Sequence, residues 1–265
     1  MERWRNRWAV VTGASAGIGR ALVELLVAGG ARVVAVARRR QRLEELAGQL
    51  QKRYTGAVVE VCVADLAAAD GPAQVAEFTS RRGLQVDLLV NNAGFGAYGE
   101  FLETPLERYR EMIQVNVTAV VDLTYRYLPG MVERRRGDIL IVASTAAFQP
   151  VPYLTCYAAT KGFDLLFAEA LAEEYRRFGI RVCALCPGPT ETEFQAVAGQ
   201  PGRLFRLAEK PEKVARVGLQ ALAAGRTYVI SGWWNYLQTQ AERLAPRGFI
   251  ARSAAALMAP ARVRR

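Results

Sequence analysis

The sequence contains no histidine, and this absence excludes several kinds of active site at once. A chain without histidine cannot form a Ser-His-Asp triad, use an imidazole as a general base or bind a metal ion through imidazole nitrogen. We therefore predict no histidine-based site and no metal site.

Cysteine is also scarce, with four residues in 265 (Cys62, Cys156, Cys183 and Cys186). Cys183 and Cys186 match a C-x-x-C spacing, but they lie in an apolar run, 180–186, that is typical of a strand. Residues three apart on a strand point to opposite faces of the sheet. We therefore predict buried structural thiols and no redox or metal pair, and nothing here requires an oxidising compartment.

Long apolar runs are missing as well. No run approaches the roughly 18 residues that would indicate a membrane-spanning helix. The basic start, MERWRNRW, leads directly into a strand-like run and has neither the apolar core nor the cleavage site of a signal peptide. We therefore expect a cytoplasmic protein.

The formal net charge of +10 is unevenly placed. Residues 243–265 contain six arginines and no acid, and residues 1–8 contain three arginines and one glutamate. The rest of the chain is close to neutral, which argues against a nucleic-acid-binding face. We predict a domain over residues 1–245 followed by a basic C-terminal tail over 246–265.

Apolar segments of strand length alternate with segments of helical pattern along the whole chain. Strands are predicted at 8–12, 32–37, 57–63, 86–90, 138–143, 180–186 and 227–230. Helices are predicted at 18–28, 40–53, 72–82, 105–135 (with a bend near Pro129), 154–178, 211–224 and 233–245. This alternation, without a linker or an internal repeat, predicts an α/β fold: one Rossmann-like doubly wound domain with a seven-stranded parallel sheet and helices on both faces.

A glycine-rich turn, TGASAGIG at 12–19, joins the first predicted strand to the first helix. Its glycines, Gly13, Gly17 and Gly19, allow a tight turn and close approach of the backbone to a pyrophosphate at the helix N-terminus. We predict that Gly13, Ser15, Gly17, Ile18 and Gly19 bind a dinucleotide.

The end of the second strand indicates which dinucleotide is bound. An acid at this point usually binds the ribose 2′-hydroxyl of NAD, whereas an arginine accommodates the 2′-phosphate of NADP. The chain has three arginines at 38–40 and no acid before Glu44. We predict NADP(H), with Arg38 on the 2′-phosphate. The alternative is that these arginines form only the solvated start of a helix.

Tyr157 and Lys161 are four residues apart in a predicted helix, which places them on one face. A neighbouring ammonium group lowers the pKa of a phenol, so that the phenol can exchange a proton nearer neutrality. Ser144, at the end of a buried strand, can bind a substrate oxygen beside the phenol. The alternative is an ordinary surface pair, because this spacing is common on helices.

Taken together, the motifs resemble those of the short-chain dehydrogenase/reductase family. They are TGASAGIG, Asp65, NNAG at 91–94, Asn116, Ser144, YAATK at 157–161 and PGP at 187–189, and they extend over about residues 8–230. The resemblance implies an oxidoreductase that transfers a hydride between NADP(H) and a carbonyl or secondary alcohol.

The resemblance also implies roles for individual residues. Tyr157 would be the general acid/base, Lys161 would lower its pKa and bind the nicotinamide ribose, and Ser144 would orient the substrate oxygen. Asn116 would hold a water that links Lys161 to solvent; the alternative is a helix-interior polar residue bonded to backbone. The implied cofactor contacts also include Asp65, Asn92, Gly188 and Thr190.

The loop at about 190–210 is predicted to cover the substrate. It contains the apolar residues Phe194, Val197, Leu204 and Phe205. The opposite wall is predicted to hold Phe95, Tyr98, Phe148 and Tyr153. This composition favours an apolar carbonyl substrate over a sugar.

Two function classes stay open from the sequence. The first is an NADP-dependent oxidoreductase, expected as a homodimer or homotetramer. The second is a catalytically silent NADP-binding regulatory or scaffold protein on the same fold. The basic tail either packs on a neighbouring subunit or forms a helix that contacts a membrane surface.

Overall fold

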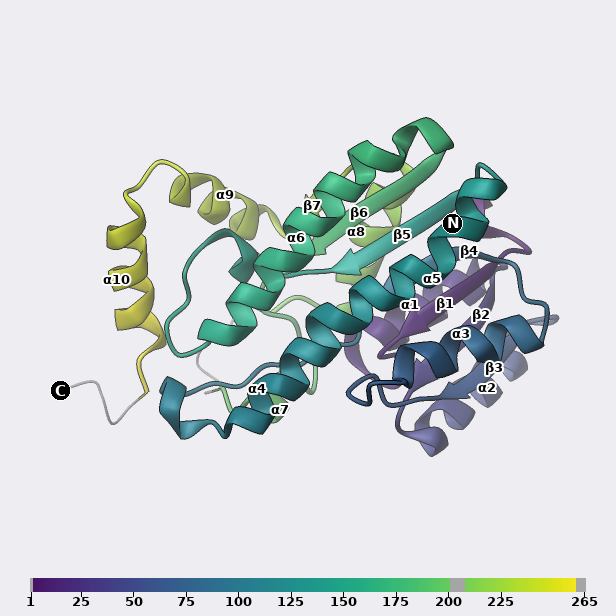
Figure 1. Ribbon diagram of the computed structural model, residues 1–265, viewed down its shortest axis with the longest axis horizontal. Helices are drawn as coiled ribbons and strands as arrows, with labels where there is room; N and C mark the ends of the chain where they lie inside the picture. The colour runs from purple at the N-terminus through teal and green to yellow at the C-terminus, as the bar shows by residue number, and fades with distance from the viewer. Residues whose placement is uncertain (1, 201–207, 261–265) are drawn as a thin grey trace.

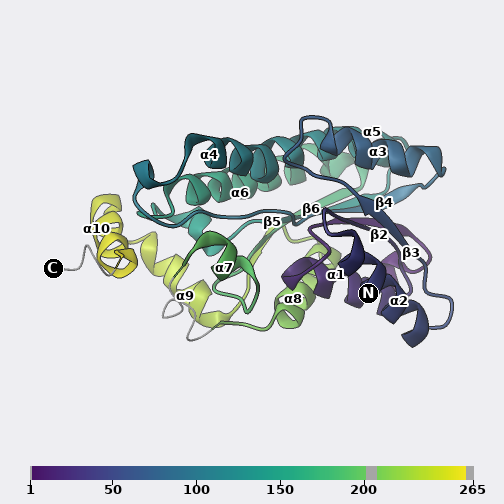
Figure 2. The same ribbon diagram turned by 90° about the horizontal axis from the view of Figure 1, so that it is seen from below.

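The computed structural model describes residues 2–200 and 208–260 and forms three layers around one parallel sheet (Figures 1 and 2). The strands are β1 (Trp8–Thr12), β2 (Arg32–Ala37), β3 (Val59–Val63), β4 (Val86–Asn91), β5 (Gly137–Val142), β6 (Ile180–Cys186) and β7 (Tyr228–Ile230). Their order is β3-β2-β1-β4-β5-β6-β7, and all pairings are parallel. The predicted seven-stranded, doubly wound sheet is therefore confirmed.

Helices cover both faces of the sheet. They are α1 (Gly17–Ala28), α2 (Arg40–Arg53), α3 (Gly71–Arg81), α4 (Leu106–Ile113), α5 (Ala119–Glu133), α6 (Thr155–Tyr175), α7 (Phe194–Ala198), α8 (Pro211–Ala223), α9 (Trp233–Glu242) and α10 (Arg247–Met258). Helices α1, α2 and α8 lie on one face and α3, α5 and α6 on the other (Figure 2). Within the described residues, no helix is both long and apolar enough to span a bilayer.

The strands are buried on both faces, so the core consists of two apolar layers separated by the sheet. Alternate strand residues belong to different layers, as Val10 and Val11 do. Cys183 and Cys186 also face opposite layers, both as free, fully buried thiols. Burial raises the pKa of Cys183 to about 12 and that of Cys186 further still, as expected for inert structural thiols.

The strand order reverses direction between β1 and β4. The chain winds one way from β1 to β3 and the other way from β4 to β7. The loops at the carboxyl ends of β1 and β4 therefore diverge to opposite sides and leave a crevice, which is where such sheets bind ligands.

The helix predicted over 105–135 is present, because helical backbone runs without a break from Leu106 to Glu133. Residues 114–118 form a π-helical turn between α4 and α5, and this turn contains Asn116. Helix α5 continues through Pro129, and the bend at this residue stays a prediction. Such turns inside α-helices are frequent at functional sites.

Candidate active site

A cavity of about 1040 Å³ lies at the carboxyl edge of the sheet. Nearly all the residues predicted to form the site line it: Gly13, Ser15, Gly17, Ile18, Gly19, Arg38, Asp65, Asn92, Ser144, Tyr157, Lys161, Gly188 and Thr190. Asn116 is the exception, because it is fully buried behind the wall. The tertiary structure thus brings together residues that follow six strands, with two more from α6, in one space.

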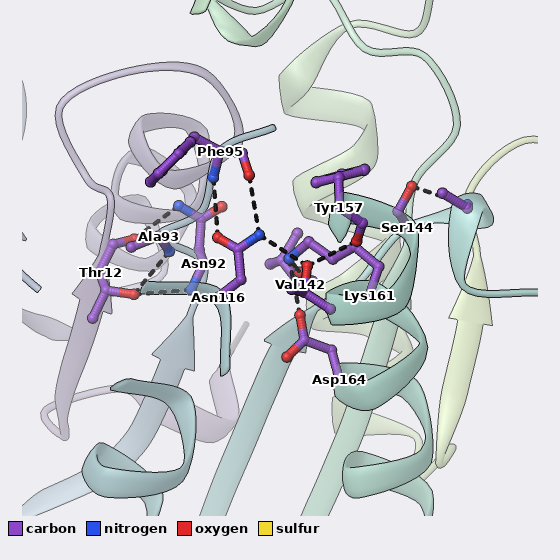
Figure 3. A network of polar contacts seen from close by, with 12 residues as sticks. Thr12, Asn92, Ala93, Phe95, Asn116, Val142, Ser144, Tyr157, Lys161 and Asp164 are labelled. Atoms are coloured by element: carbon purple, nitrogen blue, oxygen red, sulfur yellow. Dashed lines mark hydrogen bonds and ion pairs between the residues drawn. The ribbon is translucent and has the colours of Figure 1, made fainter. Parts of the chain in front are cut away.

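The glycine-rich turn is fixed against the end of β4 (Figure 3). Thr12 Oγ1 accepts hydrogen bonds from the backbone N–H of Asn92 (2.9 Å) and Ala93 (3.0 Å), and Asn92 Nδ2 donates to Thr12 O at 2.8 Å. A Cβ atom at position 19 would lie 2.3 Å from Gly13 O, so only glycine fits there. The turn therefore has the close-packed backbone that cradles a pyrophosphate.

Lys161 lies deep in the site and is held on two sides. Its Nζ donates to Val142 O at 2.7 Å and to Asp164 Oδ2 at 2.9 Å (Figure 3). The side chains of Lys161 and Asp164 are only 7% and 1% exposed. Burial lowers the pKa of Lys161, but neighbouring groups, above all the Asp164 carboxylate, together raise it by more. Lys161 therefore stays an ammonium.

Asp164 is a site residue that the sequence analysis missed. Its only signal was an i, i+3 spacing from Lys161, which is as common on helix surfaces as the Tyr157–Lys161 spacing. Its Oδ1 is buried and has no hydrogen-bond partner among the described residues.

Burial dominates the proton affinity of Tyr157. Desolvation raises the pKa of the phenol above its ordinary value, while the Lys161 charge and a hydrogen bond with Ser144 lower it. Asp164 weakens the effect of Lys161, because its negative charge also raises the pKa of Tyr157. Lys161 thus lowers the pKa of Tyr157 as expected, but burial raises it by more. Without cofactor, Tyr157 therefore stays protonated at neutral pH.

A titration of the cofactor-free protein followed by tyrosine ¹³Cζ NMR tests this result. We expect the Tyr157 signal, assigned by its absence from Tyr157→Phe, to remain unshifted up to pH values above about 10, the ordinary phenol pKa. The sign follows from burial, which disfavours the charged phenolate and so moves ionisation to higher pH. A midpoint near neutrality would contradict it.

Ser144 is placed beside Tyr157 by the end of β5. Its Oγ accepts a hydrogen bond from Ala146 N at 3.1 Å, which fixes the side chain at the start of a 3₁₀ turn over Thr145–Phe148. An oxygen held in this way still has a proton to donate. Ser144 and Tyr157 can therefore bind one substrate oxygen together.

Asn116 uses its amide to bind the backbone after β4. It donates from Nδ2 to Phe95 O and Thr160 Oγ1, each at 3.0 Å, and accepts from Phe95 N at 3.1 Å (Figure 3). A Cβ atom at Gly94 would lie 3.1 Å from Asn116 Oδ1 and 3.5 Å from Lys161 Nζ. Gly94 thus lies close to both side chains. The backbone-bonding alternative is present in the structure, and the water-holding role stays a prediction.

Cationic side chains lie beside the glycine-rich turn at Ser15. Arg39 donates from Nε and Nη2 to Ser15 Oγ at 3.1 and 2.9 Å, and its Nη1 lies 2.7 Å from the carboxylate of Glu193. Arg42 pairs with the same carboxylate, and these contacts lower the pKa of Glu193. The Glu193 carboxylate shows that this set of side chains accommodates an anion beside Ser15.

Arg38, the arginine chosen from the sequence, also lines the cavity, but its contact is looser. Its Nη1 lies 3.7 Å from Asp65 Oδ2, and its side chain is 69% exposed. The sequence could not predict whether Arg38 or Arg39 contacts Ser15, because that depends on the direction in which the chain turns after β2.

The substrate side of the cavity is apolar. The Phe194 ring lies over Tyr157, with 5.0 Å between ring centroids and a tilt of 51°, and Val197 also lines the cavity. Of the aromatic residues predicted for the opposite wall, only Phe95 lines it. Phe148 packs against Tyr228, and Tyr98 pairs with Tyr153. Leu204 and Phe205 lie outside the described residues.

The segment predicted as a basic tail forms part of this wall. Residues 247–258 form helix α10, and Tyr98 Oη donates to Met258 O at 2.5 Å. Phe249, Ile250, Leu257 and Met258 line the cavity. The prediction of a separate tail is therefore wrong for α10, because it lines the cavity of its own chain, with Phe249 and Leu257 still more than half exposed. Residues 261–265 lie outside the described part.

Comparisons with known proteins agree with this geometry. A family model described as short chain dehydrogenase matches residues 7–201. The human very-long-chain 3-oxoacyl-CoA reductase is 38% identical over 186 residues, which are 69% of this chain and 59% of the human protein. This chain thus matches about three fifths of that relative's length.

Two solved structures are similar over most of their length. One is a structure from work on 7beta-hydroxysteroid dehydrogenase stereoselectivity. It has a TM-score of 0.86 at 26% identity, and the match covers 96% of this chain and 98% of that one. A short-chain dehydrogenase from Sphingobium yanoikuyae in complex with NADPH has a TM-score of 0.80 at 29% identity, covering 90% and 94%.

Proposed function

This chain belongs to the short-chain dehydrogenase/reductase family of oxidoreductases, and we propose that it reduces a carbonyl group on a long apolar substrate with NADPH. The observation that carries the proposal is the single cavity in which Tyr157, Ser144 and Lys161 lie beside a glycine-rich turn and under an apolar wall. The names of the relatives, a 3-oxoacyl-CoA reductase and a hydroxysteroid dehydrogenase, support apolar carbonyl compounds as the substrate class.

The proposed chemistry divides between the cofactor and the chain. A bound nicotinamide dinucleotide supplies the hydride. Ser144 donates a hydrogen bond to the substrate carbonyl oxygen, and Tyr157 transfers its proton to that oxygen as negative charge develops on it. Lys161 remains an ammonium through its pairing with Asp164 and stabilises the phenolate that Tyr157 becomes.

The substrate class is tested by measuring NADPH consumption with 3-oxoacyl thioesters of increasing chain length, bulky ketones and hexoses. We expect kcat/KM to rise with acyl length, because burying each CH₂ group against the wall contributes about 0.8 kcal/mol, or roughly fourfold. Hexoses should not be turned over. A preference for hexoses, or activity independent of chain length, would contradict the proposal.

The choice of NADPH depends on the cations beside Ser15. Arg38→Asp and Arg39→Asp should each shift the ratio of kcat/KM for NADPH over NADH by about 10–100-fold toward NADH, since a hydrogen bond to a charged group contributes about 1.5–3 kcal/mol. Arg40→Asp is the matched control. Arg40 pairs with Glu44 and does not line the cavity, so this variant should leave the ratio unchanged. An unchanged ratio in both test variants would refute the 2′-phosphate contact.

A catalytically silent NADP-binding protein is the second candidate. It predicts NADPH binding without turnover of any compound in the panel. The ammonium of Lys161, maintained beside Tyr157 at the cost of burying an ion pair, favours the enzyme.

A further inference from the structure

A second cavity, of about 690 Å³, lies at the edge of the sheet opposite the active site. It is formed where β1, β5, β6 and β7 begin, at the end of the molecule that holds the N-terminus, far from α9 and α10 (Figure 1). Strand β5 runs from this edge to the active site, which separates the two cavities by roughly 17 Å at about 3.3 Å per residue.

The lining of this cavity is dominated by arginine. Seven arginines line it: Arg3, Arg7, Arg134, Arg135, Arg136, Arg176 and Arg181. Within the described part of the chain, no acidic residue lines it. The arginines come from the N-terminal segment, the turn between α5 and β5, the end of α6 and the start of β6, so only the tertiary structure gathers them.

Buried carboxylates behind the cavity hold two of these arginines in fixed positions. Arg3 binds Asp138 through Nε (2.8 Å) and Nη2 (3.0 Å), and Arg136 binds Asp87 at 3.1 and 3.2 Å. Trp4 also donates to Asp138 at 2.8 Å. Each guanidinium has five N–H donors, so both arginines keep donors free for a ligand.

Backbone carbonyl groups accept hydrogen bonds from three more of the arginines. Arg134 and Arg135 donate to Val86 O and Arg177 O, each at 2.8 Å, and Arg181 donates to Ala223 O. These contacts have a structural role, because they satisfy carbonyl groups at the ends of elements. They also hold the charged groups in place before any ligand arrives.

Contacts within the fold do not account for all seven arginines. The carboxylates paired with the seven arginines are those of Asp87, Asp138 and Glu173, which leaves four positive charges uncompensated. Arg134 Nε is buried and has no partner, and Arg7 makes no ion pair or side-chain hydrogen bond within the described ranges. Arginines that served only the fold would need acids nearby to offset their repulsion.

We propose that this cavity binds a ligand with two or more phosphate groups. Guanidinium groups match phosphate oxygens in paired hydrogen bonds, and a set of fixed, uncompensated arginines favours a multiply charged anion. The ligand is either a soluble polyphosphorylated metabolite or the headgroups of anionic lipids, which share this chemistry. The site is separate from the proposed dinucleotide site.

Isothermal titration of the full chain with inorganic tripolyphosphate tests the proposal, with NADPH at saturation so that the probe does not enter the cofactor site. The test variant is Arg7→Gln with Arg176→Gln, since neither arginine pairs with a buried carboxylate. We expect the Kd for the probe to rise at least about tenfold. Arg243→Gln with Arg247→Gln removes the same charge from the other end of the molecule and should leave the Kd unchanged.

Sedimentation with phosphatidylglycerol vesicles distinguishes the two sources of phosphate. If tripolyphosphate binds and the test variant loses this binding, the ligand is a soluble one. If only the vesicles bind and the test variant loses this binding, the ligand is the lipid headgroups. The proposal is overturned if neither probe binds saturably, or if the test and control variants weaken binding equally. Far-UV circular dichroism verifies that both variants fold.

Discussion

Replacing Tyr157 with phenylalanine should lower kcat/KM for carbonyl reduction by about 10³-fold and leave the Kd for NADPH within about twofold. Proton transfer by a positioned side chain contributes roughly 10²–10⁴-fold to a rate, and in the proposed mechanism Tyr157, which lines the cavity with Ser144, is the proton donor. Phenylalanine keeps the ring that packs against Phe194, so the shape of the site is preserved.

Tyr153→Phe is the matched control for this variant. Tyr153 lies four residues earlier, does not line the cavity, and pairs with Tyr98 through its ring, which phenylalanine retains. Its kcat/KM should stay within about twofold of the wild type. If Tyr157→Phe kept near-wild-type turnover, Tyr157 would not be the acid, and the proposed mechanism would fail.

Asp164→Ala should lower the free energy of unfolding by about 3–5 kcal/mol. The change leaves the Lys161 ammonium buried without its carboxylate, and an uncompensated buried charge has a cost of this size. Chemical denaturation measures the effect. Asp122→Ala removes a carboxylate from an exposed i, i+4 pair with Arg126 and should cost at most about 1 kcal/mol.

A second variant separates stability from catalysis at this pair. Lys161→Met combined with Asp164→Leu replaces both charges by apolar side chains, and should recover most of the stability lost in Asp164→Ala. It should nevertheless be inactive, because no ammonium remains to stabilise the phenolate of Tyr157. Recovery of activity along with stability would mean that Lys161 has only a structural role.

Much of the fold could be predicted because strands and helices follow from residue patterns within short segments. The strands at 8–12, 32–37 and 180–186 and the helix at 40–53 agree with the structure at both ends. These strands are mostly apolar because they are buried on both faces, and α1 and α2 follow β1 and β2 after short turns. The clustering of the site residues followed, because parallel strands place their carboxyl ends at one edge.

The errors occurred where a contact joins distant segments. The sequence showed the apolar face of 247–258 but not that α10 lines the cavity, since its contact with Tyr98 joins residues 160 positions apart. Phe148 resembled a wall residue because it follows Ser144, yet it turns into the core beside Tyr228. The π-helical turn in the long helix was also unpredicted, and it contains Asn116, whose amide binds the backbone of Phe95.

The sequence by itself determined the fold class, the family resemblance and the edge of the sheet that carries the chemistry, because these depend on residue types at short, regular spacings. Only the tertiary structure decided that Asp164 holds Lys161, that Arg39 lies against Ser15, and that arginines from four segments surround a second cavity. Charge interactions and desolvation depend on distance in space, so side chains separated by 135 residues, such as Arg3 and Asp138, act together only after the chain has folded.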